Sequence, residues 1–250
     1  MRSVGIRYKA FQVAASGVMA RKFDKPPEAD ASRGVFETIL VVAGRPHELE
    51  SHLARLDHSA RALYGAPLAD GLAAELAQAA HGHALVRMRV DHVPGAAPQV
   101  AVSPFEELLP ERAAAIEPVL VAGGFGAHKL ADRSWLEEIE ASSEGEGARP
   151  LLVTTAGELL ETTRANVFLE RGGALATPPL DGAILPGVVR SLVIALARRL
   201  RIAIAERPLS VADLEAADAV LLTSSLRLLE WTVATPAVER LRDALAAEIT

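Results

Sequence analysis

The chain has no cysteine in its 250 residues. Without thiols it cannot form disulfides, bind a metal through thiolates or use a cysteine nucleophile, and their absence is typical of a cytoplasmic protein. The histidines offer no zinc pattern instead, because the spacing of His81, His83 and His92 matches no common ligand set. We therefore predict a cytoplasmic protein without a metal site.

Long apolar runs and an excess of positive charge are also missing. No segment approaches the roughly 20 apolar residues that a membrane helix needs. The formal net charge of -6 supplies no basic field for a nucleic acid backbone. Half of the residues are nevertheless apolar, which is typical of a globular protein with a substantial core. We predict neither a membrane nor a nucleic acid partner.

Strand and helix patterns alternate along the chain. Residues 35–42 are β-branched and apolar, as in a strand, and residues 48–64 place leucine and alanine at helical spacings of three and four. Prolines and glutamates gather around residues 104–118, which suits a connector. The predicted fold class is α/β (α+β) in two domains, with an N-terminal α/β domain over residues 1–105, a connector over 106–117 and a C-terminal α/β domain over 118–250.

The same periodicities predict the remaining elements. Pro186 suits the first position of a helix, and Ser210 with Asp213 gives a weak capping-box signal before another. Further strands are predicted at 84–90, 99–102, 119–122, 151–155, 167–170, 174–177, 202–205 and 219–223, and further helices at 72–80, 133–141, from 186, after 210 and at 237–249.

Lys129 is the only lysine after residue 25, in a chain that otherwise uses arginine for its cations. An amine can form a Schiff base with an aldehyde, whereas a guanidinium cannot. Lys129 alone is equally consistent with a surface lysine left by chance. Its meaning therefore depends on the residues that accompany it.

Two further groups complete the requirements of pyridoxal phosphate chemistry, namely an acid at the ring nitrogen and an anion site for the phosphate. Glu161 offers the acid. Residues 185–190 read as a loop that enters a helix, and the amides of a helix N-terminus bind phosphate. Arg55, Ser224 and Ser225 could complete that anion site from other segments. The residues therefore indicate a pyridoxal phosphate enzyme.

Several motifs occur in an order that resembles the class IV aminotransferase family. This family comprises fold type IV pyridoxal phosphate enzymes, such as branched-chain and D-amino acid aminotransferases and aminodeoxychorismate lyase. The resemblance covers roughly residues 34–233, and several motifs in one order are unlikely by chance. The motifs are residues 34–38, 52–56, 128–129, 161–168, 177–178, 185–190, 217–220 and 223–225.

The resemblance implies a role for each matching position. Lys129 would form the Schiff base and Glu161 would sit at the pyridine nitrogen, in the segment that also contains Asn166. The phosphate would be bound by Arg55, by the backbone amides of Val188 and Val189, and by the hydroxyl of Ser225, and we predict from its position that Ser224 joins them. Many relatives have threonine at position 189, so valine removes one hydrogen bond, about 1 kcal/mol. The resemblance also implies a cofactor between two domains, and a homodimer.

The lyase members of the family give the closest likeness. Residues 34–38 resemble their first strand, in which a threonine at the position of Thr38 assists proton transfer; a β-branched strand residue without a role is an equal alternative. We predict a 4-amino-4-deoxychorismate lyase that makes pyruvate and 4-aminobenzoate for folate biosynthesis. The alternatives are an aminotransferase of D- or branched-chain amino acids and a non-catalytic homologue.

The residues that bind the substrate carboxylates are harder to predict. Residues 86–92 lack the Thr-Arg-Gly ending that such lyases carry, and Ser224 stands where some of them have asparagine. Arg87, Arg89 and Arg227 are candidates, although a solvated or structural cation is the commoner role of an arginine.

Overall fold

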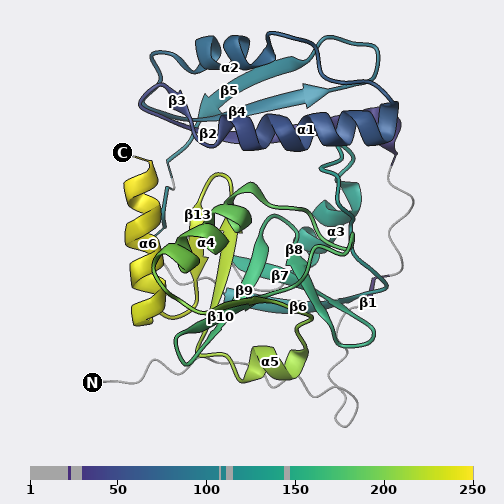
Figure 1. The fold of residues 1–250 in the computed structure, drawn as a ribbon. Coiled ribbons are helices and arrows are strands. Elements are labelled where there is room, and N and C mark those ends of the chain that lie inside the picture. Colours follow the sequence, from purple (N-terminus) through teal and green to yellow (C-terminus); the bar gives the residue numbers. More distant parts are fainter. Residues whose placement is uncertain (1–21, 24–29, 107, 111–114, 144–146, 250) are drawn as a thin grey trace.

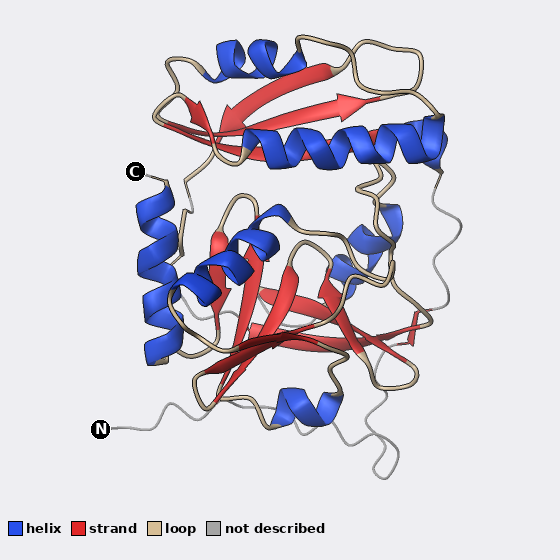
Figure 2. Ribbon diagram, viewed as in Figure 1, coloured by secondary structure: helices blue, strands red, loops and turns tan. Residues whose placement is uncertain are grey.

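The computed structural model describes residues 22–23, 30–106, 108–110, 115–143 and 147–249, which form two sheets with helices around them (Figure 1). The smaller sheet has four strands and the larger has nine among these residues. The α/β fold class predicted from the sequence is confirmed. Figure 2 shows helices packed around both sheets.

The smaller sheet is antiparallel, in the order β3-β2-β4-β5. Two helices pack against it, and its core contains Ile39, Leu56, Leu76 and Met88. The predicted strand 35–42 and helix 72–80 are confirmed to the residue. The bounds are β2 Val35–Val42, β3 Arg45–Pro46, α1 Leu49–Tyr64, α2 Leu72–Ala80, β4 Leu85–His92 and β5 Gln99–Pro104, after a 3-10 turn at Ala31–Arg33.

The smaller sheet with its helices is called the smaller unit, and the larger sheet with its helices the larger unit. Strand β2 contributes to the cores of both units, because its side chains alternate between the two faces of the sheet. Val35, Ile39 and Val41 belong to the core of the smaller unit. Leu40, on the opposite face, belongs to a core cluster of the larger unit. The sheet of the smaller unit is therefore covered on one face by its own helices and on the other partly by the larger unit.

The larger sheet runs β1-β6-β7-β8-β9-β10-β11, and β12 pairs with both β9 and β13. It curls between helices that cover different sides (Figure 1). The strands are β1 Lys22–Phe23, β6 Ala115–Val121, β7 Ala148–Thr154, β8 Leu159–Thr162, β9 Asn166–Arg171, β10 Ala174–Thr177, β11 Ile204–Glu206, β12 Ala219–Ser224 and β13 Leu228–Trp231, and the helices are α3 Ser134–Ser142, α4 Val188–Arg199, α5 Val211–Glu215 and α6 Pro236–Glu248.

Neighbouring residues of β9 show how this sheet divides the core. Phe168 packs in the cluster that contains the apolar residues of α4 and α6. Val167 packs in a second cluster, with Leu214 of α5. The period of two along the strand therefore gives the sheet two buried faces, which explains the nearly continuous apolar runs of its central strands.

The structure moves two of the predicted boundaries. Strand β6 begins at Ala115, inside the predicted connector 106–117, because residues 115–117 already pair in parallel with residues 148–150. Strand β1, predicted as part of the N-terminal domain 1–105, pairs instead with β6 in the larger sheet. Residues 1–21 of that predicted domain lie outside the described residues.

Helix ends follow local chemistry. The weak Ser210–Asp213 signal is a full capping box. Helix α4 begins at Val188 rather than at Pro186, because Gly187 keeps an extended backbone as its N-cap residue. No helix in the described part of the chain is both long and apolar enough to cross a membrane.

The segment around Lys129 joins the smaller sheet although it follows the first strand of the larger one. The Phe36 amide donates to the Lys129 carbonyl at 2.9 Å, and the Ala131 amide donates to the Gly34 carbonyl at 2.8 Å. Gly34 has φ +98°, and a Cβ there would lie 2.6 Å from the His92 carbonyl oxygen. Only glycine fits this position, and the two hydrogen bonds hold Lys129 beside β2.

Candidate active site

Lys129 lies where two hollows meet. A narrow pocket of about 50 Å³ and a wider cavity of about 610 Å³ share its side chain and several other lining residues. Its Nζ lies 5.0 Å from the centre of the Phe36 ring. Burial and then the nearby Arg55 charge lower the pKa of Lys129 to about 7. A substantial fraction of the amine is therefore unprotonated near neutral pH and able to act as a nucleophile.

Glu161, at the end of β8, is a second buried titratable group in the narrow pocket. Its Oε1 accepts from the Leu185 amide at 3.1 Å, and its Oε2 accepts from Asn166 Nδ2 at 3.0 Å. Asn166 also donates to the Leu185 carbonyl at 2.9 Å. Burial raises the pKa of Glu161 to about 8. The carboxyl group is therefore held in place and can share a proton with a ring nitrogen.

The N-terminus of α4 forms another part of the narrow pocket. Gly187, Val188 and Val189 all line it. A Cβ on Gly187 would lie 1.9 Å from Asn166 Oδ1, so no larger residue fits there. The first amides of a helix have no partner within the helix and carry its positive dipole. This end of the pocket therefore suits an anionic group.

Arg55 reaches the same end of the pocket from α1. Its Nη1 donates to the Pro186 carbonyl at 2.9 Å, and its Nε and Nη2 donate to Glu37, each at 2.7 Å. The side chain is only 8% exposed. Arg55 therefore links the smaller unit to the loop that precedes α4.

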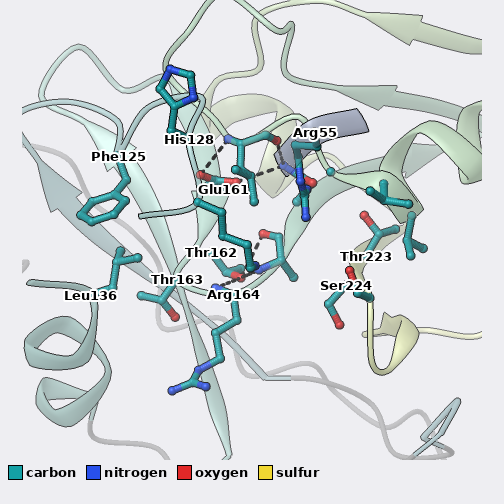
Figure 3. A pocket seen from close by; sticks show the side chains of 18 of the residues that line it. Arg55, Phe125, His128, Leu136, Glu161, Thr162, Thr163, Arg164, Thr223 and Ser224 are labelled. Atoms are coloured by element: carbon teal, nitrogen blue, oxygen red, sulfur yellow. Dashed lines mark hydrogen bonds between the residues drawn. The ribbon is translucent and has the colours of Figure 1, made fainter. Parts of the chain in front are cut away.

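Hydroxyl groups complete the wall opposite Phe125 and Leu136 (Figure 3). Thr223 and Ser224 end β12, and Ser225 follows them. The buried Thr223 Oγ1 has no hydrogen-bond partner among the described residues. An amine, a buried acid and an anion site with arginine, amides and hydroxyls therefore share one small space, which fits the three requirements of pyridoxal phosphate.

Cations outnumber carboxylates in the lining of the wider cavity, in a chain whose net charge is -6. Register explains part of this lining, because Arg89 lies opposite Thr38 and Arg87 lies opposite Leu40 on one face of the smaller sheet. The larger unit adds four arginines and three glutamates. The charged lining residues, apart from Lys129, are Arg87, Arg89, Arg133, Arg149, Arg164, Arg227, Glu137, Glu140 and Glu230.

The arginines of this cavity differ in their partners. Arg89 forms two hydrogen bonds with Asp91, at 2.7 and 2.6 Å, and its guanidinium lies 3.9 Å from the centre of the Phe36 ring. Arg149 donates twice to Glu230, at 3.1 and 2.8 Å. Arg87 is half-buried, and its Nε has no hydrogen-bond partner in the described part of the chain. Arg87 is therefore the cavity arginine best placed to gain a partner from a ligand.

Every residue predicted for the site lines one or both hollows. The sequence alone did not indicate Phe36, Glu37 or Arg133 as site residues. Glu37 could have been recognised from the sequence, because a carboxylate on the apolar face of a predicted strand is unusual. The predicted residues divide into those of the narrow pocket, Arg55, Lys129, Glu161, Asn166, Val188, Val189, Ser224 and Ser225, and those of the wider cavity, Thr38, Arg87, Arg89 and Arg227, with Lys129, Ser224 and Ser225 in both.

Comparison with known proteins gives one family match. Residues 34–230 match the model of the family described as amino-transferase class IV. Among curated relatives, a putative branched-chain-amino-acid aminotransferase of Methanocaldococcus jannaschii is 36% identical over 92 residues, 37% of this chain and 32% of that protein. A probable one of Thermotoga maritima is 42% identical over 73 residues, 29% of this chain and 27% of that protein. The matches thus span about a third or less of these relatives.

Solved structures match over more of the chain. A putative 4-amino-4-deoxychorismate lyase from Legionella pneumophila has a TM-score of 0.76 and 23% identity, and the match covers 92% of this chain and all of that one. A hypothetical aminotransferase from Mycobacterium tuberculosis, in its PLP-bound form, has a TM-score of 0.72 and 25% identity, with 90% and 93% covered. The first likeness shows a shared fold.

Proposed function

Because this chain belongs to the class IV aminotransferase family, whose enzymes depend on pyridoxal phosphate, we propose that it is a 4-amino-4-deoxychorismate lyase. The reaction releases pyruvate and 4-aminobenzoate, a folate precursor. Pyridoxal phosphate would supply an electron-accepting ring that stabilises a carbanion next to the substrate nitrogen. The side chains that line the two hollows would bind the cofactor and the substrate and transfer the protons.

The narrow pocket, with the adjoining part of the wider cavity at Lys129, would hold the cofactor. The Lys129 amine would attach to its aldehyde carbon, and Glu161, oriented by Asn166, would hydrogen-bond to its ring nitrogen. The phosphate would be bound at the start of α4, by the amides of two valines, by Arg55 and by two serine hydroxyls. The residues proposed for the phosphate are Arg55, Val188, Val189, Ser224 and Ser225.

Lys129 and Thr38 would move the protons. Once its amine is free, Lys129, with its lowered pKa, would remove the proton from the ring carbon that bears the substrate nitrogen. The bond between the neighbouring ring carbon and the enolpyruvyl oxygen then breaks, and the released fragment takes up a proton to become pyruvate. Thr38 lines the same cavity and would relay that proton.

One observation carries the choice of lyase, namely the arginine-rich lining of the wider cavity. Aminodeoxychorismate has two carboxylates, which arginines bind well. A branched-chain substrate would instead need an apolar pocket for its side chain. We propose Arg87 as the main carboxylate ligand, with Arg89 and Arg227 nearby.

An aminotransferase is the second candidate. The curated relatives quoted above favour it, because both are described as branched-chain-amino-acid aminotransferases. The same lysine would then return its proton to the cofactor rather than promote release of a leaving group. A homologue without catalysis is a third candidate, and covalent binding of the cofactor at Lys129 would contradict it.

We also propose that the enzyme is a homodimer, on the strength of the family resemblance alone. Light scattering of the purified protein would measure the mass of the particle. A mass near twice the 26.4 kDa of one chain supports the dimer, and a mass near 26.4 kDa contradicts it.

The decisive experiment is to supply enzymatically generated aminodeoxychorismate to the protein with pyridoxal phosphate. We expect 4-aminobenzoate and pyruvate to appear in equal amounts, and Lys129→Ala to release neither. If the protein binds the cofactor covalently and releases neither product, the lyase is excluded. A screen of amino donors, followed by the absorbance of the aminated cofactor, would then test the aminotransferase.

A further inference from the structure

Glu37 is a buried carboxylate that the proposed reaction does not use. It is 1% exposed and lies on β2 between Phe36 and Thr38, which both face the wider cavity. Its own side chain points the other way, toward α1. A charge buried in such a place is costly unless it is paired and hydrogen-bonded. The position of Glu37 therefore calls for a specific partner.

Two residues of α1 satisfy this carboxylate. Oε1 accepts from Arg55 Nε at 2.7 Å, and Oε2 accepts both from Arg55 Nη2 and from His52 Nδ1, each at 2.7 Å. His52 and Arg55 are three residues apart, so they lie on the same face of the helix. The Arg55 contact is bidentate, which restrains the plane of the guanidinium as well as its position.

The charge states support a fixed ion pair. Burial alone would raise the pKa of Glu37, but the Arg55 charge and the hydrogen bonds from His52 and Arg55 outweigh burial and lower it to about 2. Burial, in contrast, lowers the pKa of His52. Glu37 is therefore ionised and His52 neutral near pH 7, and the His52 Nδ1–H donates to the carboxylate.

The opposite end of Arg55 faces the narrow pocket. Its Nη1 donates to the Pro186 carbonyl, next to the start of α4. An arginine has five N–H donors, and three of those of Arg55 are occupied by protein partners within the described residues. The two others remain for an anion. Their direction depends on how Glu37 holds the guanidinium plane.

We propose that Glu37 is a positioning residue that orients Arg55 toward the phosphate of the cofactor. This inference rests on the proposed function, because it assumes that the narrow pocket binds pyridoxal phosphate. The negative charge of Glu37 also repels the negatively charged phosphate. Glu37 therefore weakens the electrostatic attraction of the site for the phosphate, but it aligns the Arg55 guanidinium before the cofactor binds.

The test is the preference of the protein for pyridoxal phosphate over pyridoxal, which lacks only the phosphate. Dissociation constants for both are measured by absorbance titration of the parent, Glu37→Gln and Glu170→Gln. Glutamine keeps the size of Glu37 but presents an amide group to one of its donors. Glu170 is a matched control, because it is a carboxylate only 2% exposed that lines neither hollow.

We expect Glu37→Gln to reduce the preference for pyridoxal phosphate by about tenfold, the value of one charge-assisted hydrogen bond. The dissociation constant of pyridoxal should hardly change, and Glu170→Gln should keep the parent preference. Equal weakening of both ligands would mean that Glu37 is merely structural. An unchanged or increased preference would also overturn the inference, since repulsion would then outweigh alignment.

A second variant covers the case in which Glu37→Gln does not fold, as judged by circular dichroism. Glu37→Asp keeps the charge but is one methylene shorter, so it should weaken the alignment and lower the preference by a smaller factor. A preference equal to that of the parent would contradict the proposal. A parent protein without any preference would instead contradict the proposed cofactor site itself, which separates the two failures.

Discussion

The narrow pocket and the wider cavity are built by different means. In the narrow pocket, buried polar groups are hydrogen-bonded to one another or to buried neighbours, as Asn166 is to Glu161 and Arg55 is to Glu37. In the wider cavity, long arginine side chains project from strands and loops of both units. Several of them have an acidic partner, such as Asp91 for Arg89 and Glu230 for Arg149.

This difference suggests a division of labour. A site with satisfied, buried partners is rigid and tolerates little change, because removal of one partner leaves another unpaired. A site made of partly exposed arginines can change its partners at low cost. We therefore expect substitution of the buried polar groups of the narrow pocket to affect catalysis as a whole, and substitution of the arginines of the wider cavity to affect the choice of substrate.

The largest effect should come from Lys129→Ala. The visible absorption of the covalently bound cofactor should disappear, and turnover should fall by at least about a thousandfold, because the attachment point and the base are lost together. The protein should still fold, since the Lys129 side chain forms no hydrogen bond or ion pair within the described part of the chain, although its charge acts on the buried Glu161. Spectroscopy, product assay and thermal melting would check the three points. Retained turnover would remove Lys129 from the centre of the site.

Arg87→Met should have an intermediate effect, confined to the wider cavity. Loss of one carboxylate ligand should lower kcat/KM by about 10- to 100-fold, mostly through KM, with no change in cofactor absorbance. Arg45→Met is the matched control, because Arg45 is exposed on the same sheet and lines neither hollow. Equal effects of the two substitutions would argue against Arg87 as a ligand.

Val189→Thr should have the smallest effect, and a favourable one. The added hydroxyl should tighten the binding of pyridoxal phosphate by about fivefold, the worth of one net hydrogen bond. Val189 is also part of the core beneath α4. If titration shows unchanged affinity while the melting temperature falls, the hydroxyl faces the core, and the helix amides alone serve the phosphate at this position.

Much of this molecule could be predicted from local sequence signals. The strand at 35–42 and the helix at 72–80 follow from periodicity, and the capping box at Ser210 follows from two residues three apart. Lys129 and Glu161 stand out because an unusual residue type or an ordered motif marks each of them. Such signals need no knowledge of distant contacts.

The remainder depends on pairings that local patterns do not contain. Strand β1 could not be assigned to the larger sheet, because its partner lies about a hundred residues away, at Leu120 and Val121. Glu37 looked like part of a motif, and its pairing with Arg55 depends on how α1 packs against β2. The arginine lining likewise arises from the register of β2 with β4 and from residues of the larger unit.

The attachment of the Lys129 segment to β2 has a mechanical consequence. Through the hydrogen bonds of Phe36 and Gly34, the reactive lysine should travel with the smaller unit, whereas α4 belongs to the larger one. Any hinge motion between the units would then change the distance from the amine to the anion site. A cofactor bound to Lys129 at one end and to the start of α4 at the other would link the two units. It would reduce the hinge motion and make the two units unfold together.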